Sequence, residues 1–153
     1  MRKIEPMGHL DAAVSIPGSK SFTQRGLVVA FLAEGKSLLR NALLSEDSTY
    51  LLEALKDLGA EIRIDGKDLH VTGSGGRLKN PGKSIYLGNN GTAMRFLTSL
   101  VSLGEGEYTL TGTERLCRRP IGALVEALRS LGVEARTRGE DGFPPVVVNA
   151  GGL

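Results

Sequence analysis

The sequence predicts an α/β fold made of two copies of one unit, and three observations predict it. The segment LLEALKDLGAEIR, which begins at Leu51, matches LVEALRSLGVEAR, which begins at Leu124, at a fixed offset of 73 residues. Both segments have apolar residues at helical spacing, then a glycine that ends the helix, then a short strand. Further upstream, RGLVVAFLAEGKSLLRN resembles RFLTSLVSLGEGEYTLTG, and each reads as an apolar helix followed by a strand.

Each unit is expected to contain, in order, a glycine-rich turn, a buried helix, a strand, an amphipathic helix and a closing hairpin. Unit one runs from about residue 12 to 76, and its hairpin is expected to turn at Asp65 and Gly66 in type I′ geometry. Unit two runs from about residue 84 to 151, and its hairpin turns within RGEDG. The first helix of each unit is apolar nearly all round, which predicts burial on every side, with helices inside and strands outside.

Composition excludes several classes of protein. The chain has 153 residues, 41% of them hydrophobic, and a net charge of only +2 without a basic stripe, so it is not expected to bind nucleic acid. The start, MRKIEPMGHLDAA, lacks an apolar signal segment, and no apolar run is long enough to span a membrane, which predicts a cytoplasmic location. One cysteine, Cys117, and two histidines predict neither a disulfide nor a metal site, and no cofactor is expected.

The stretch IPGSKSFTQRG places Lys20, Ser21 and Arg25 at the start of the first apolar helix. A cation has the wrong sign for this position, because the helix dipole already makes the N-terminal end positive. The turn can aim backbone N–H groups, and the lysine adds a point charge, so the arrangement suits an anion. The alternative is an N-cap followed by two solvated cations.

Two further helix starts repeat the arrangement. LGNNGTAMR places Gly91 and Thr92 at the start of the second apolar helix, where the alternative is a plain turn with a cap. CRRPIG is expected to supply a third start, with Pro120 at the first helical position and Arg119 just outside it, although a solvated surface arginine would look the same. Together the three starts predict a ligand that carries phosphate and carboxylate groups.

The chain resembles the N-terminal part of the 5-enolpyruvylshikimate-3-phosphate synthase (EPSP synthase) family. The motifs that carry the resemblance are PGSKS with Arg25, SED at residues 45–47, LGNNGTAMR and ERLCRRPIG, and they cover essentially the whole chain. The resemblance implies the enolpyruvyl transferase fold, an inside-out α/β barrel whose domains hold three βαβαββ units each. Residues 1–153 would then be a partial first domain with two units, and the third unit and the second domain would be absent.

The resemblance also implies an activity without metal or cofactor: transfer of the enolpyruvyl group of phosphoenolpyruvate to the 5-hydroxyl of shikimate 3-phosphate, in aromatic amino acid biosynthesis. It implies that Lys20 lies between both substrates, that Ser21 and Arg25 hold the phosphate and carboxylate region of shikimate 3-phosphate, and that Gly91 and Arg119 receive phosphoenolpyruvate. Lys20 and Arg119 are the expected catalytic residues. Thr92 belongs to the same wall, and the expected residues that orient the loops are Asp47 and Asn89.

The acid and base that move protons are expected on the absent domain, so the chain alone is expected to be inactive. Many family members have Ala where this chain has Asn90, and Asn or His where it has Gln24. The larger side chain at position 90 is expected to affect how phosphoenolpyruvate and its competitor glyphosate fit beside Gly91.

Two alternatives stay open: an enzyme like the UDP-N-acetylglucosamine enolpyruvyl transferases, whose first motif usually carries Lys-Asn, and a free-standing anion-binding module. Without a third unit, self-association through the uncovered core is also expected.

Overall fold

The computed structural model describes residues 3–4, 6 and 8–152. Within them the helices and strands are, in chain order, α1 (Lys20–Leu32), β1 (Lys36–Leu39), α2 (Glu46–Asp57), β2 (Glu61–Asp65), β3 (Asp68–Thr72), β4 (Ile85–Tyr86), α3 (Gly91–Leu100), the 3₁₀ turn η1 (Val101–Leu103), β5 (Glu105–Thr111), α4 (Glu114–Cys117), α5 (Gly122–Ser130), β6 (Glu134–Thr137) and β7 (Val146–Gly151).

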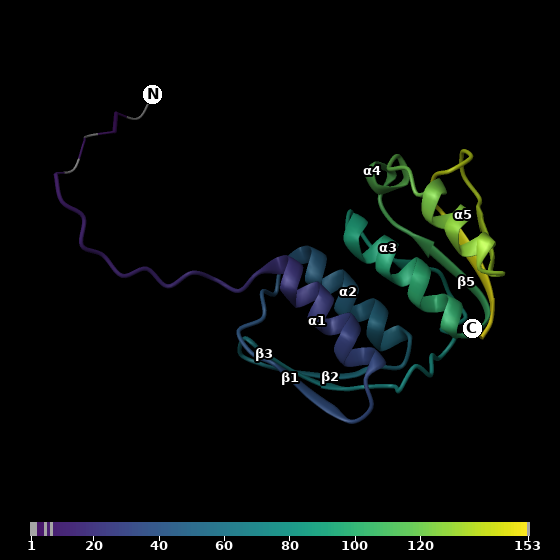
Figure 1. Ribbon diagram of the computed structural model, residues 1–153, viewed down its shortest axis with the longest axis horizontal. Helices are drawn as coiled ribbons and strands as arrows, with labels where there is room; N and C mark the ends of the chain where they lie inside the picture. Colours follow the sequence, from purple (N-terminus) through teal and green to yellow (C-terminus); the bar gives the residue numbers. More distant parts are fainter. Residues whose placement is uncertain (1–2, 5, 7, 153) are drawn as a thin grey trace.

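The strands form two sheets. The first has the order β1-β3-β2 and is antiparallel throughout, and the second has the order β4-β5-β7-β6, with β4 parallel to β5 and the other pairs antiparallel. Helices α1 and α2 pack on the first sheet, and α3 lies between these two helices and β5 of the second sheet (Figure 1). The result is a mixed α/β arrangement in which the starts of α1, α2 and α3 come together.

The helix starts follow from their capping residues. Ser19 caps α1, and its hydroxyl oxygen accepts a hydrogen bond from the Phe22 backbone N–H at 3.3 Å. Ser45 caps α2 in a capping box, in which the Ser48 hydroxyl in turn accepts from the Ser45 backbone N–H at 2.9 Å. The PGSKS and SED motifs therefore place Lys20 and the acidic residues after Ser45 in the first turns of two neighbouring helices.

One buried core joins the two sheets through the helices. Leu27 and Phe31 of α1 are fully buried, as are Leu97 of α3 and Tyr108 of β5. The prediction that α1 is buried on every side is wrong in this chain. Phe22 is 80% exposed and Val29 67% exposed, because α2, α3 and the first sheet leave one side of the helix uncovered.

The expected hairpin of the first sheet is present, but its turn type differs from the prediction. Asp65 pairs with Asp68, so the two-residue loop is Gly66 and Lys67. Gly66 has φ of +57°, whereas Lys67 lies outside the left-handed region, and type I′ needs positive φ at both positions. The turn is therefore of the II′ kind. The second predicted hairpin joins β6 to β7 through residues 138–145.

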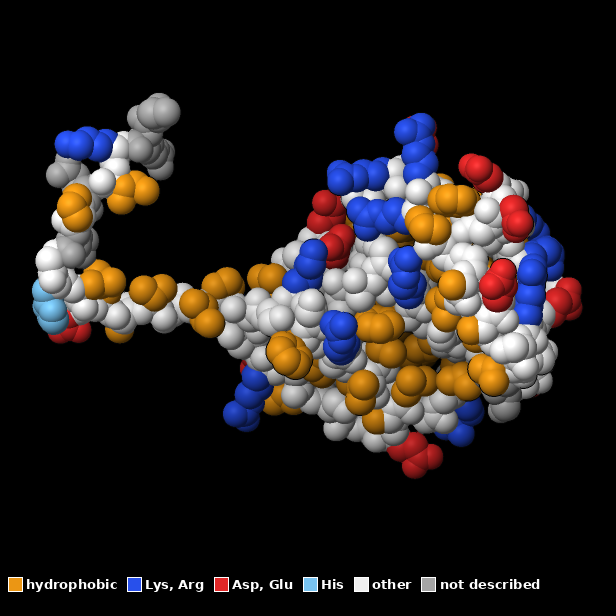
Figure 2. Space-filling view, turned by 45° about the horizontal axis from the view of Figure 1, so that its top comes forward, with side chains coloured by type: hydrophobic (Ala, Val, Ile, Leu, Met, Phe, Trp, Pro, Cys, Tyr) orange, Lys and Arg blue, Asp and Glu red, His pale blue; other side chains and the backbone are white. Residues whose placement is uncertain are grey.

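Residues 8–19 contain no helix or strand, and residues 8–16 run away from the body of the molecule, whereas Pro17 and Gly18 lie beside residues 41–44 (Figure 1). The apolar side chains of Leu10, Val14 and Ile16 are exposed along this segment (Figure 2). In the part of the chain that the structure describes, every helix is too short or too polar to cross a membrane. The predicted cytoplasmic location stays a prediction.

Candidate functional site

An open hollow of about 630 Å³ lies where the starts of α1, α2 and α3 meet. Residues from four parts of the chain surround it: the first two turns of α1, the first turn of α2, the start of α3 with the two residues before it, and the loop that follows α4. The lining residues are Lys20, Arg25, Asp47, Asn89, Asn90, Gly91, Thr92, Arg95, Phe96 and Arg119. Residues nearly 100 positions apart in the sequence thus share one surface.

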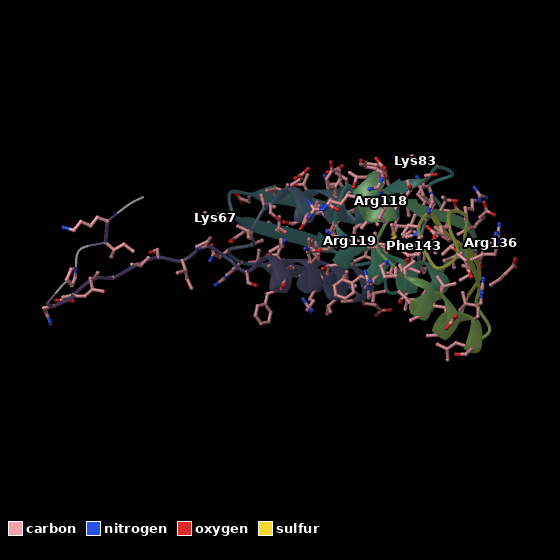
Figure 3. The ribbon with its side chains drawn as sticks, turned by 90° about the horizontal axis from the view of Figure 1, so that it is seen from above. Lys67, Lys83, Arg118, Arg119, Arg136 and Phe143 are labelled. Carbon is pink, nitrogen blue, oxygen red and sulfur yellow. The ribbon has the colours of Figure 1, made fainter. Side chains whose placement is uncertain are left out.

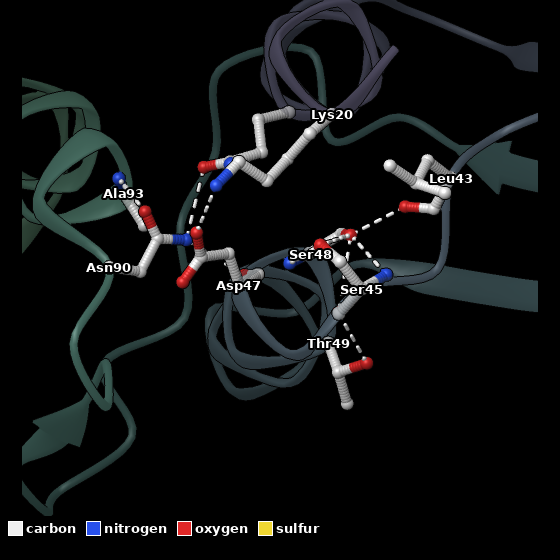
Figure 4. Close-up of polar contacts among 9 residues, drawn as sticks. Lys20, Leu43, Ser45, Asp47, Ser48, Thr49, Asn90 and Ala93 are labelled. Atoms are coloured by element: carbon white, nitrogen blue, oxygen red, sulfur yellow. Dashed lines mark hydrogen bonds and ion pairs between the residues drawn. The ribbon is translucent and has the colours of Figure 1, made fainter. Parts of the chain in front are cut away.

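Lys20 and Asp47 form the ion pair of this hollow. The Lys20 Nζ lies 2.7 Å from Oδ2 of Asp47, and the pair links the first residue of α1 to the first turn of α2 (Figure 4). The lysine side chain is 50% exposed and the aspartate 29%, so solvent screens the pair and it adds little to stability. Its consequence is positional, because it holds the lysine side chain of α1 against the first turn of α2.

Arg25 and Arg95 lie in the second turns of α1 and α3, and each donates to the backbone oxygen four residues earlier. Arg25 Nη1 donates to the backbone oxygen of Ser21 at 3.1 Å, and its guanidinium lies over the Phe96 ring, 5.6 Å from the centroid. Arg95 Nη1 donates to the Gly91 oxygen at 3.3 Å, and its Nη2 donates to the Pro120 oxygen at 2.8 Å. Arg95 therefore fixes the loop after α4 against the start of α3.

Arg119 reaches the hollow from that loop, near the middle of the molecule as seen from above (Figure 3). Its neighbour Arg118 is held by an ion pair with Glu114 and is directed elsewhere. The Arg119 guanidinium makes no hydrogen bond or ion pair within the described residues. It lies against Gly91: a Cβ at that position would be 2.9 Å from Arg119 Nη1.

The predicted position of the third helix start is wrong by two residues. Pro120 is not the first helical residue, because α5 begins at Gly122, and a separate short helix, α4, precedes Arg119. The Gly142 oxygen accepts from the backbone N–H groups of Ile121 and Gly122 at 2.8 and 3.0 Å. The first amides of α5 are thus already satisfied by the loop between β6 and β7. Arg119 still reaches the hollow, but as a side chain of the loop after α4.

The other predicted site residues divide into two groups. Thr92 and Asn89 line the hollow on either side of the α3 start, and the buried Oδ1 of Asn89 has no hydrogen-bond partner within the described chain. Ser21 is exposed in the first turn of α1 and does not line the hollow; its backbone oxygen accepts from Arg25. Seven of the eight predicted positions therefore meet at one surface.

The charges around the hollow are unequal. Four cations, of Lys20, Arg25, Arg95 and Arg119, face the single carboxylate of Asp47. Such an excess of positive charge on one concave surface attracts anions and raises their local concentration. Among the described residues no cluster of His, Cys, Asp or Glu side chains has the arrangement of a metal site.

Three residues of the hollow, Asn90, Arg95 and Phe96, were not among the predicted site residues. Asn90 is 2% exposed and caps α3, with its Oδ1 accepting from the Ala93 N–H at 2.9 Å. An asparagine directly before Gly-Thr-Ala is an N-cap signal that could have been read from the sequence. The contact of Arg95 with the Pro120 oxygen spans 25 residues, and no local pattern indicates it.

The architecture places the chain among mixed α/β proteins, and comparisons with known proteins narrow this class. Residues 4–153 match the family described as EPSP synthase (3-phosphoshikimate 1-carboxyvinyltransferase). The chain belongs to this family.

Individual relatives agree with the family match. The chain is 44% identical over 154 residues to a 3-phosphoshikimate 1-carboxyvinyltransferase of Shewanella piezotolerans, and 46% identical to the one of Shewanella amazonensis. Each alignment covers 99% of this chain and 36% of the relative, so the chain spans about a third of the length of these proteins. The solved EPSP synthase of Acinetobacter baumannii superposes with a TM-score of 0.85 at 33% identity, over 90% of this chain and 32% of that one.

Proposed function

We propose that the chain forms one wall of the substrate site of an enolpyruvyl transferase, which moves the enolpyruvyl group of phosphoenolpyruvate to the 5-hydroxyl of shikimate 3-phosphate and releases phosphate. One observation carries the proposal. Lys20, Arg25 and Arg119, which lie up to 99 positions apart in the sequence, meet in one hollow with Gly91 between them. Both substrates are multiply charged anions, and this surface is the place in the described structure where cations converge without matching acids.

The residues receive separate roles in this proposal. Lys20, at the start of α1, lies between the two substrates, while Arg25 and the nearby Ser21 hydroxyl hold the phosphate and carboxylate region of shikimate 3-phosphate. The unpaired guanidinium of Arg119 and the backbone at Gly91 receive phosphoenolpyruvate. An arginine suits this role because its fork of N–H donors matches the paired oxygens of a carboxylate or phosphate.

The chemical contribution of this wall is electrostatic. Fixed cations and helix-start amides stabilise negative charge that grows or moves during reaction, and they need no rearrangement to do so. Asp47 and Asn89 belong to the same wall. Asp47 holds the Lys20 Nζ in place through their ion pair. The described chain offers no second carboxylate or histidine in the hollow for proton transfer. We therefore expect no turnover by the 153-residue chain alone.

The architecture supports a finer proposal about the fold. From β4 onward the order of elements, apart from the short α4, is βαβαββ, and before it the order α1, β1, α2, β2, β3 lacks only the first strand. We infer that units at about residues 12–76 and 84–151 are two copies of one motif of the enolpyruvyl transferase fold. The two units form separate sheets, which agrees with this inference.

Isothermal titration of the 153-residue chain with shikimate 3-phosphate tests the function. Binding is expected to weaken as salt is raised, and shikimate without the phosphate should bind at least about tenfold more weakly, because charged hydrogen bonds contribute on the order of 1.5 to 3 kcal/mol. Equal affinity for shikimate and its phosphate would contradict the assignment of the cations. Binding of inorganic phosphate without any preference for shikimate 3-phosphate would instead favour an anion-binding module.

A further inference from the structure

We propose that Asn90 is a positioning residue, whose buried carboxamide holds the starts of three helices at fixed distances so that Lys20 and Arg119 face the same bound anion. This inference rests on the proposed function and adds a residue that acts through its neighbours. Asn90 is 2% exposed and Gln24, its partner on α1, is 1% exposed, so the pair is shielded from water.

The oxygen of the Asn90 carboxamide and both protons of its nitrogen make hydrogen bonds. Its Oδ1 accepts from the Ala93 N–H of α3 at 2.9 Å, and its Nδ2 donates to Gln24 Oε1 of α1 at 3.0 Å and to the Asp47 backbone oxygen of α2 at 2.7 Å. Figure 4 shows Asn90 between Ala93 on one side and Asp47 on the other. One side chain thus bonds to three helices that are separate in sequence.

The orientation of this carboxamide follows from its neighbours. The Ala93 N–H can only donate and the Asp47 backbone oxygen can only accept, so the oxygen of Asn90 must face α3 and its nitrogen must face α2. The nitrogen then has one proton left, and Gln24 must present its oxygen to it. A buried network that engages the Asn90 oxygen and both of its N–H groups favours one arrangement of the helices.

The network connects directly to the charges of the hollow. Asp47 is held twice, because its backbone oxygen accepts from Asn90 while its carboxylate binds Lys20 Nζ at 2.7 Å. On the other side, the residue after Asn90 is Gly91, against which the Arg119 guanidinium lies. A displacement of Asn90 would therefore change the separation between Lys20 on α1 and Arg119 beside α3.

Asn80 provides a matched control on the same chain. Its Nδ2 also donates to two oxygens, here the backbone oxygens of Glu105 at 3.3 Å and Glu107 at 3.1 Å, and its Oδ1 accepts from the Gly82 N–H at 3.0 Å. Asn80 does not line the hollow. The two asparagines thus make the same number of hydrogen bonds, but Asn80 is exposed and its bonds do not reach the helix starts, whereas Asn90 is buried among them.

The experiment compares Asn90→Ser with Asn80→Ser. A serine at position 90 can still cap α3, since its hydroxyl accepts from the Ala93 N–H, but it is too short to reach Gln24 and Asp47. The measurements are urea unfolding, isothermal titration with shikimate 3-phosphate and with inorganic phosphate, and the amide NMR signals of Lys20 and Gly91. We expect Asn90→Ser to weaken both ligands about tenfold and to shift both signals, whereas Asn80→Ser should leave binding and signals unchanged.

A second variant covers the case in which Asn90→Ser fails to fold. Gln24→Met keeps the volume of the side chain and the α3 cap but removes the acceptor that Asn90 uses. It is expected to weaken the same ligands, and in a folded double variant the two changes should cost less together than the sum of the single losses, because they remove one shared contact. Wild-type affinity in both single variants, with unshifted Lys20 and Gly91 signals, overturns the proposal.

The result also separates this inference from the proposed function. If the wild-type chain binds neither shikimate 3-phosphate nor phosphate, the function fails, and the NMR signals alone decide the positioning role. Shifts of Lys20 and Gly91 in Asn90→Ser and not in Asn80→Ser would then still support it. The same shifts in both variants, or in neither, would contradict it.

Discussion

Gly91 and Arg119 lie against each other, so closely that a Cβ on residue 91 would be 2.9 Å from Nη1 of the arginine. The missing side chain is therefore a condition for the position of the Arg119 guanidinium in the hollow. The backbone of Gly91 itself does not require glycine, because the residue is helical and its φ lies outside the left-handed region. Space for the arginine is the reason for a glycine here.

We expect Gly91→Ala to weaken anion binding without loss of stability. The added methyl group displaces the flexible end of Arg119, while alanine favours the helix more than glycine does. Titration with phosphoenolpyruvate and thermal unfolding measure the two effects. Gly151→Ala is the control, because a Cβ there meets no atom within 4 Å. Unchanged affinity in Gly91→Ala would show that Arg119 does not act where the structure places it.

A second prediction concerns Tyr108, a fully buried residue of β5 whose hydroxyl has no hydrogen-bond partner within the described residues. Burial, the largest cause, raises the pKa of this phenol above its ordinary value, because the charged form would lose its hydration. The folded state therefore keeps the proton at a pH where the unfolded state has lost it. The free energy of unfolding must fall as the pH rises above about 10.

Tyr108→Phe should remove this dependence and leave the protein at least as stable as wild type near neutral pH. Removal of an unpaired buried hydroxyl is expected to stabilise by up to about 1 kcal/mol. The difference between the two proteins, measured by urea unfolding, should widen above pH 10. Tyr86→Phe, which removes a hydroxyl from a half-exposed side chain, is the control. A marked loss of stability in Tyr108→Phe would indicate a hydrogen bond that this account lacks.

Self-association is a third prediction, and it follows from an apolar hollow of about 500 Å³ between α1, α3 and α5. Most of its lining is apolar: Val28, Leu32, Phe96, Leu100, Leu103, Leu124, Ala127, Leu128 and Leu131. Orange side chains gather over the lower middle of the body in Figure 2. Burial of such surface is worth roughly 25 cal/mol per Å², so we expect a second copy of the chain to cover it.

Sedimentation velocity across a concentration series, together with binding of a hydrophobic dye, measures this association. The test variant is Leu131→Glu, which places a charge on a residue of the apolar hollow that is 67% exposed. The control is Leu38→Glu, which places a charge on the first sheet, outside this hollow. Only Leu131→Glu is expected to lower the association constant. A compact monomer at high concentration that binds no dye would show that two units close a core unaided.

The local parts of this structure could be predicted from the sequence because local chemistry determines them. The glycines after the amphipathic helices, Gly59 and Gly132, do have φ values of +104° and +89° at the helix ends. PGSKS and LGNNG do start helices, with caps at Ser19 and Asn90. These features depend on a few neighbouring residues, so a pattern in the sequence is enough to find them.

The features that sequence reasoning missed depend on contacts between distant residues. The start of α5 was misplaced because the Gly142 oxygen, 20 residues later, satisfies the amides of Ile121 and Gly122. The bond between Asn90 and Gln24 spans 66 residues. The burial of α1 was overestimated because its apolar residues indicate a tendency to be buried, whereas the elements that pack on each side of the helix are set by distant parts of the chain.

The measurement that tests the central claim most directly is titration of shikimate 3-phosphate into Lys20→Met and Lys36→Met. Lys20 lines the hollow and binds Asp47, whereas Lys36 is exposed at the start of β1, outside the hollow. Loss of a charged hydrogen bond costs on the order of 1.5 to 3 kcal/mol, so Lys20→Met should weaken binding roughly tenfold to a hundredfold. Lys36→Met should bind as wild type does. Equal affinities in the two variants would contradict the account.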